Sequence, residues 1–126
     1  MLNHTLEHEL MAANRLAFGP ATGRLFYSGY PAALAALRSA MTANPGLGRS
    51  ILESPVGKLL SQANLSDSIN KAAWTAASYL WAAGAGGSVN AWVVEIPSAS
   101  SIWVTTELPA VTQNPNVFYP INYPPF

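Results

Sequence analysis

Cysteine is absent from this 126-residue sequence, and charged residues are scarce. Without cysteine, the chain can form no disulfide, no thiolate nucleophile and no zinc site of the cysteine type. Asp, Glu, Lys and Arg together make up 10% of the residues, whereas roughly a quarter is usual in a globular protein. There are only six acidic residues, so each is a candidate for a specific task.

Basic runs and long apolar runs are missing too. The formal net charge is zero, so the positive surface expected of a nucleic-acid-binding protein is lacking, and we exclude that class. The longest apolar stretch, residues 72–85, is too short and too interrupted for insertion into a membrane. No signal peptide is recognisable, so an export signal would lie on a longer parent protein. His4 and His8 have no third ligand nearby, and we expect no metal site.

A chain of this length supports one domain, residues 1–126, around one core. Apolar residues at helical spacing predict an amphipathic N-terminal helix in residues 1–18. Further helices are predicted from Pro31 to about 43, over residues 55–62 behind an N-cap at Ser54, and from about 67 to 83. The proline-rich tail, residues 112–126, is expected to lie extended on its own domain, with partner binding as the alternative.

Three segments rich in β-branched and aromatic residues predict strands over residues 24–27, 89–96 and 102–107. The expected fold class is α/β or α+β, with a small central sheet and an N-terminal helical layer. In a strand over 102–107, Trp103, Thr105 and Glu107 would share one face. On the helix before the second strand, Trp74 and Ser78 share a face by their spacing.

Two isolated carboxylates suggest cleavage of a glycosidic bond. Glu107 lies among apolar residues, and Glu53 lies immediately before a helix. Most glycosidases need two carboxylates, but the pyridinium of NAD leaves as a neutral molecule and needs no general acid, so one buried carboxylate suffices. Tryptophans can stack on the pyridinium and exclude water. The alternative is an exposed carboxylate beside core tryptophans, and the pattern alone does not select NAD.

The order and spacing of four motifs, within residues 25–108, resemble the ADP-ribosyl cyclase and NAD glycohydrolase family. The segment LFYS at 25–28 corresponds to the family's L-[FL]-W-S, and ILES at 51–54 corresponds to T-L-E-D. The segment WTAAS at 74–78 corresponds to W-x-x-x-S, with Trp81 and Ala82 at a phenylalanine-alanine pair. Finally, SIW at 101–103 followed by Glu107 corresponds to S-T-F-x-x-x-E.

The resemblance implies a role for each matched residue. Glu107 would be the catalytic carboxylate that stabilises or traps the ribosyl cation. Glu53 would engage the nicotinamide carboxamide and steer the intermediate between water and cyclisation, and Trp74 would stack on the nicotinamide. Tyr27 would form a wall of the pocket, and Ser78 would bond a ribose hydroxyl or Glu107. The ribose and phosphates would be held by Ser28, Gly29, Ser101 and Trp103.

The sequence also departs from the family pattern. Gly29 replaces an arginine, so phosphate binding would fall to backbone amides, Arg24 or Arg49, and Ser54 replaces an acidic residue. The family's cysteines are absent, which argues against a secreted, glycosylated ectoenzyme. Related small domains occur at the ends of bacterial polymorphic toxins, a context that a compact domain without cysteine suits.

The expected function is therefore an NAD(P)+ glycohydrolase that releases nicotinamide and ADP-ribose, with NAD or NADP as substrate and no cofactor. It would be a secreted or translocated effector that acts in the cytoplasm of a target cell and is neutralised by a cognate immunity protein. Formation of cyclic ADP-ribose and ribosyl transfer to a protein are alternatives with the same fold. A non-catalytic nucleotide-binding or protein-interaction module is the alternative of another class.

Overall fold

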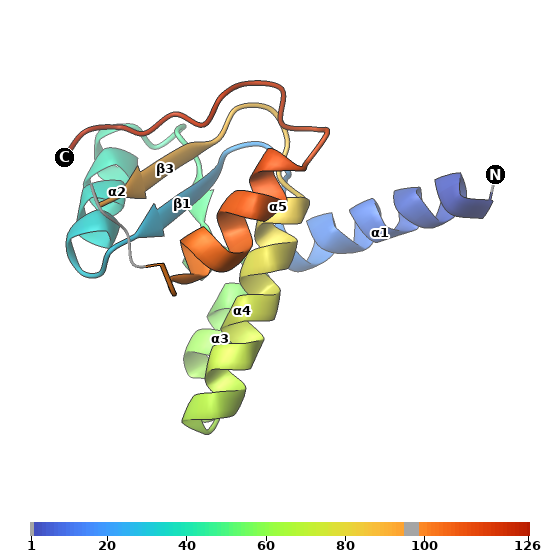
Figure 1. Ribbon diagram of the computed structural model, residues 1–126, viewed down its shortest axis with the longest axis horizontal. Helices are drawn as coiled ribbons and strands as arrows, with labels where there is room; N and C mark the ends of the chain where they lie inside the picture. Colours follow the sequence, from blue (N-terminus) through green and yellow to red (C-terminus); the bar gives the residue numbers. More distant parts are fainter. Residues whose placement is uncertain (1, 95–98) are drawn as a thin grey trace.

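The computed structural model describes residues 2–94 and 99–126, which form helices around a small sheet (Figure 1). In chain order the elements are α1 (Leu2–Phe18), β1 (Arg24–Ser28), α2 (Ala32–Ala43), β2 (Arg49–Ser50), the 3-10 turn η1 (Ile51–Glu53), α3 (Pro55–Gln62), α4 (Asp67–Ala83), β3 (Asn90–Val93), the π-helical turn η2 (Trp103–Glu107) and α5 (Leu108–Thr112). The predicted helices therefore all form. No helix in the described ranges is long and apolar enough to cross a membrane.

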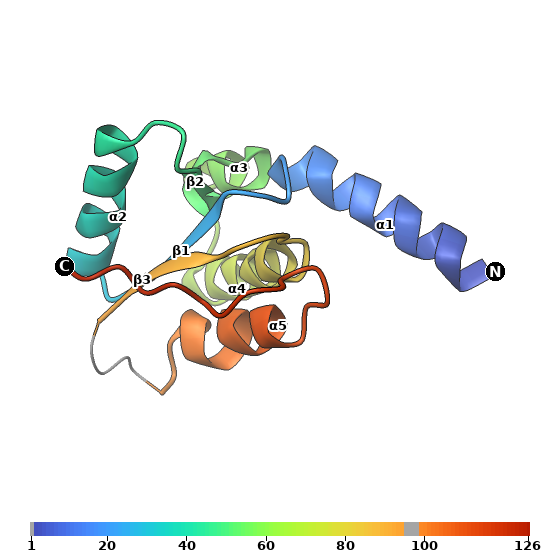
Figure 2. The same ribbon diagram turned by 90° about the horizontal axis from the view of Figure 1, so that it is seen from above.

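The sheet has three parallel strands in the order β2-β1-β3. Successive residues of β1 point to opposite faces, as the period of a strand requires. Leu25 packs with Leu37 and Trp92 on the face that α2 covers. Phe26 packs with Trp81 and others on the face that α4 and α5 cover (Figure 2). Both faces are thus buried, which is typical of a parallel sheet.

The N-terminal helix α1 extends away from the rest of the molecule in both views (Figures 1 and 2). Its C-terminal residue Phe18 is buried in the main core beside Trp81. Leu6 and Leu10, nearer its free end, are exposed. Only the last turns of α1 therefore contribute to the core.

The strand expected over residues 102–107 is wrong, because η2 makes this segment helical and α5 continues the helix after it. Ser101 supports the start of the helical segment, since its Oγ accepts a hydrogen bond from the Val104 N–H at 3.2 Å. The β propensity of Val104 and Thr105 is a weak preference, which the local cap and the burial of Trp103 and Glu107 override. Trp103 and Glu107, four residues apart, both point inward, whereas Thr105 is exposed instead of sharing their face.

The other two sequence-based strands are nearly right. β1 covers residues 24–28, and β3 covers residues 90–93, while positions 95 and 96 of the expected strand lie outside the described residues. The third strand of the sheet is the short β2, which the sequence did not predict. Two residues carry too little of a period-2 pattern to be detected.

From about residue 117 the C-terminal tail lies extended along the domain, whereas Thr112, expected in the tail, ends α5 and is followed by turns. The Ala91 N–H donates to the Asn122 carbonyl at 2.9 Å, and the Asn122 N–H donates to the Val89 carbonyl at 2.9 Å. The Tyr123 ring meets the Trp103 ring edge-on, with centroids 6.4 Å apart. Backbone pairing and ring contact thus fix the tail beside β3.

Candidate active site

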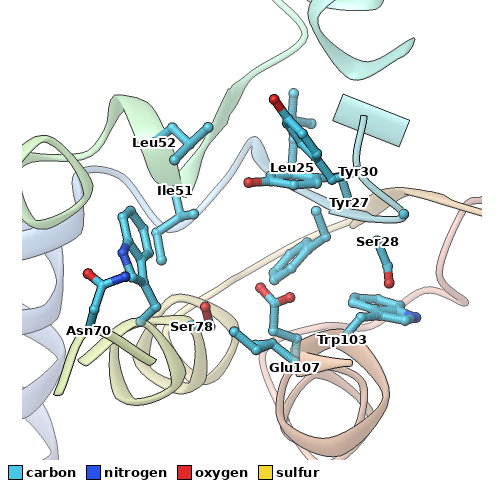
Figure 3. A pocket seen from close by; sticks show the side chains of 14 residues that line it. Leu25, Tyr27, Ser28, Tyr30, Ile51, Leu52, Asn70, Ser78, Trp103 and Glu107 are labelled. Carbon is cyan, nitrogen blue, oxygen red and sulfur yellow. The ribbon is translucent and has the colours of Figure 1, made fainter. Parts of the chain in front are cut away.

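A cavity of about 730 Å³ opens at the carboxyl end of β1. This is where ligands usually bind in sheets of parallel strands. Its lining comes from four parts of the chain, which Figure 3 shows converging: β1 and the turn after it, η1, α4, and η2. The lining side chains include Phe26, Tyr27, Ser28, Tyr30, Ile51, Leu52, Asn70, Trp74, Ser78, Ile102, Trp103 and Glu107.

Glu107 is the one acidic side chain among those described around the cavity. It is 7% exposed, and its carboxylate points into the cavity between Ser78 and Trp103 in Figure 3. Burial raises its pKa from 4.5 to about 8, because removal from water disfavours the charged form. Without a cation beside it the carboxyl group is therefore mainly protonated at neutral pH, and a cationic ligand would favour its ionisation.

Trp103 and Glu107 come to the same cavity because η2 is helical. Four residues separate them, which is about one turn. Trp103 is 2% exposed and packs against Phe26, with ring centroids 5.7 Å apart. The carboxylate is thus surrounded by aromatic and apolar surface, which is the cause of its raised pKa.

Trp74 and Ser78, which their spacing places on one face of α4, both line the cavity. Trp81, next along this face, is fully buried, and its Nε1 donates to the Leu25 carbonyl at 3.2 Å. The same helix face therefore contributes to the cavity at Trp74 and to the core at Trp81.

The predicted residues Tyr27, Ser28 and Gly29 also line the cavity. The pKa of Tyr27 is raised, chiefly by burial and also by the nearby charge of Glu107. Gly29 has φ of 110°, and a Cβ at this position would collide with the Val94 side chain. Only glycine fits that backbone comfortably, which is why this chain cannot keep an arginine here without rearrangement.

Glu53, predicted to reach the substrate, is not among the residues lining the cavity. Its Oε1 accepts hydrogen bonds from the Ser50 N–H at 2.8 Å and the Ser50 hydroxyl at 2.9 Å. In return the Ser50 Oγ accepts from the Leu52 N–H at 3.2 Å, so Glu53 completes a capping box around η1. Trp74 and Glu107 therefore line the same cavity, whereas Glu53 is held in the turn beside it.

Arg24 connects elements of the fold. The prediction that it binds the phosphates of the substrate therefore has no support from its contacts. Its side chain is 1% exposed and donates to the carbonyls of Pro20, Trp81 and Gly19 and to Asn14 Oδ1, at 2.7–3.1 Å. The guanidinium carbon lies 4.8 Å from the centre of the Trp81 ring. Arg49 likewise donates to the carbonyls of Phe18 and Pro20.

Ser101 is also absent from the cavity lining, and its Oγ instead accepts from the Val104 N–H at the start of the helical segment. Sequence reasoning missed several residues that do line the cavity: Phe26, Tyr30, Ile51, Leu52, Asn70 and Ile102. Asn70 had a detectable signal, since it precedes Trp74 by one helical turn. Within the part of the chain that the structure describes, no cluster of three metal-ligating side chains is present.

No protein-family model and no curated protein matches the sequence. A solved structure does match: the crystal structure of an ADP ribosyl cyclase complexed with N1-cIDPR, with a TM-score of 0.53 and 21% sequence identity. The match covers 75% of this chain but 45% of that one, so the chain spans less than half the length of the cyclase. The likeness establishes an α+β fold of the ADP-ribosyl cyclase type, as the sequence predicted.

Proposed function

We propose that the protein is an NAD(P)+ glycohydrolase, which cleaves the bond between nicotinamide and ribose. The observation that carries the proposal is Glu107, a single buried carboxyl group in an aromatic cavity that has room for a nucleotide's reacting end. The cyclase-like fold supports an NAD-related activity. A reaction that needs one carboxylate and no general acid is compatible with the side chains of this cavity.

The chemical step follows from the charges. The pyridinium brings a positive charge into the cavity, and this charge favours the ionised form of Glu107. The bond between ribose C1′ and the pyridinium nitrogen breaks, its electron pair stays on nitrogen, and nicotinamide leaves neutral. The Glu107 carboxylate stabilises the cation left at C1′. Water then adds at C1′ and releases a proton, which yields ADP-ribose.

The surrounding side chains have defined tasks in this proposal. Trp74 stacks on the pyridinium ring, because an indole face attracts a cation. Tyr27 and Trp103 exclude bulk water, which strengthens the field of the carboxylate. Ser78 and Ser28 supply hydroxyl groups to the ribose. We propose water as the principal acceptor, because Glu53, the residue expected to steer the intermediate, does not line the cavity.

The biological setting that we propose is an effector that depletes NAD in the cytoplasm of a target cell. A cognate immunity protein would inhibit it most directly by covering the cavity. Tyr30 at the cavity mouth is 80% exposed and is a natural contact for such a partner. Expression in bacteria tests this setting: toxicity and loss of cellular NAD should both disappear in Glu107→Gln.

The biochemical test is incubation of the purified domain with NAD and, separately, with NADP. Chromatography resolves nicotinamide, ADP-ribose and cyclic ADP-ribose. Nicotinamide and ADP-ribose formed in equal amounts would support hydrolysis, and cyclic ADP-ribose as the main product would identify a cyclase instead. No nicotinamide from either substrate would contradict the proposed activity and favour a non-catalytic binding module.

A further inference from the structure

Three side chains of α4 line the cavity in a row. Asn70, Trp74 and Ser78 are spaced four residues apart, so they follow one face of the helix. The helical rise places Asn70 about 12 Å from Ser78 along the axis. Ser78 lies between Asn70 and Glu107 in Figure 3. Along α4 the cavity therefore offers a carboxamide, then an indole, then a hydroxyl close to the carboxylate.

A nicotinamide ribosyl group has its parts in the same order. Its carboxamide is followed by the pyridinium ring, and the ring is followed by the ribose whose C1′ reacts. With the ring stacked on Trp74 and C1′ facing Glu107, the substrate carboxamide is directed along α4 toward Asn70. We infer that Asn70 is the residue that recognises the nicotinamide carboxamide. This inference rests on the proposed function and adds a specificity determinant to it.

The Asn70 side chain is available for this task. Its backbone N–H continues the helix by donating to the Ser66 carbonyl at 2.8 Å, while no described residue forms a hydrogen bond with its carboxamide group. It is half-buried at the cavity wall. A primary amide both donates and accepts, so two carboxamides can pair through two hydrogen bonds.

Glu53, to which the resemblance gave this role, is less suited to it. One of its carboxylate oxygens already accepts two hydrogen bonds from Ser50. An ionised carboxylate has no donor, so it would leave the carbonyl oxygen of nicotinamide without a partner. Asn70 can satisfy both the amino group and the carbonyl oxygen of the ligand.

The test measures coupling between residue 70 and the substrate carboxamide. Wild type and Asn70→Ala are compared on NAD and on the NAD analogue whose pyridinium ring carries no carboxamide. Asn64→Ala, the same change at an exposed position in the loop before α4, is the matched control. Alanine has a higher helix propensity than asparagine, so Asn70→Ala should fold.

We expect Asn70→Ala to lower kcat/KM for NAD about tenfold or more, the effect of one to two lost hydrogen bonds. Its kcat/KM for the analogue should stay within about twofold of wild type, because the analogue never made those bonds. Because each variant is compared with wild type on the same substrate, the different leaving-group chemistry of the analogue cancels. The inhibition constant of free nicotinamide should rise about tenfold as well.

An equal loss on both substrates would overturn the role of Asn70, since it would indicate a general disturbance of the cavity. An unchanged kcat/KM for NAD would overturn it too. In either case, nicotinamide release that still requires Glu107 would leave the proposed function intact. Failure of the wild type to cleave NAD and the analogue would instead refute the proposed function, and the inference with it.

Discussion

Replacing Glu107 by glutamine should make the protein more stable, increasingly so as pH rises. The pKa of Glu107 is about 8 in the folded protein, against the ordinary 4.5 expected in the unfolded chain. The protonated carboxyl group thus favours the folded state fully below pH 4.5, and this contribution is lost as pH rises through about 8. Between pH 5 and 8 the loss is about 3 to 4 kcal/mol.

Glutamine stays neutral across this range and avoids the loss. The free energy of unfolding is measured by denaturant titration with tryptophan fluorescence. Its value for Glu107→Gln should exceed that of wild type, and the difference should grow by about 3 to 4 kcal/mol from pH 5 to pH 8. Such a difference is a large part of the stability of a small domain. Glu9→Gln, the same change at an exposed site, serves as control.

A margin between Glu107→Gln and wild type that does not change with pH would refute the reasoning. It would mean that the carboxyl group ionises in the folded protein as readily as in water. The raised pKa that we attribute to burial of Glu107 in the cavity would then be contradicted.

Other predictions concern activity and folding. The kcat/KM of wild type should rise with pH, about tenfold per unit below the pKa of about 8 of Glu107, and a flat pH profile would contradict this. Trp74→Ala should lower kcat/KM about tenfold through the lost cation–π contact, with an unchanged circular dichroism spectrum as control. Arg24→Lys should destabilise the protein by about 2–4 kcal/mol in thermal unfolding, because lysine cannot serve four acceptors in the same geometry; a change below about 0.5 kcal/mol would count against its structural role. Gly57→Ala should lower the free energy of unfolding by about 3 kcal/mol or more, since its Cβ would collide with the Ile51 carbonyl. Gly46→Ala, whose Cβ meets no close neighbour, is the control and should change it by less than about 0.5 kcal/mol.

The sequence was most informative where local rules decide the structure. Helix spacing and caps located α3 behind Ser54, and the same spacing put Trp74 and Ser78 on one face. It was misleading for residues 102–107, where β-branched residues form a π-helical turn. Glu107 nevertheless lines the cavity. The motif was enough to single out this residue, whereas its helical backbone depends on packing that the motif does not show.

The roles of Arg24 and Glu53 depend on tertiary contacts that one sequence does not reveal. Arg24 finds acceptors from three separate segments, including Trp81 on α4. Glu53 finds its partners three residues away in Ser50, and this S-x-x-E capping box was visible in the sequence. A charged residue in a chain with few charges therefore indicates a task, and that task can be structural.

We propose that the Glu107 carboxylate drives departure of nicotinamide. The most direct test of this proposal is the initial rate of nicotinamide release from NAD at pH 8.5 by wild type and by Glu107→Gln, after both are shown to unfold cooperatively. We expect steady release by wild type and a rate at least about a hundredfold lower in the variant. Comparable rates in the two proteins would contradict it.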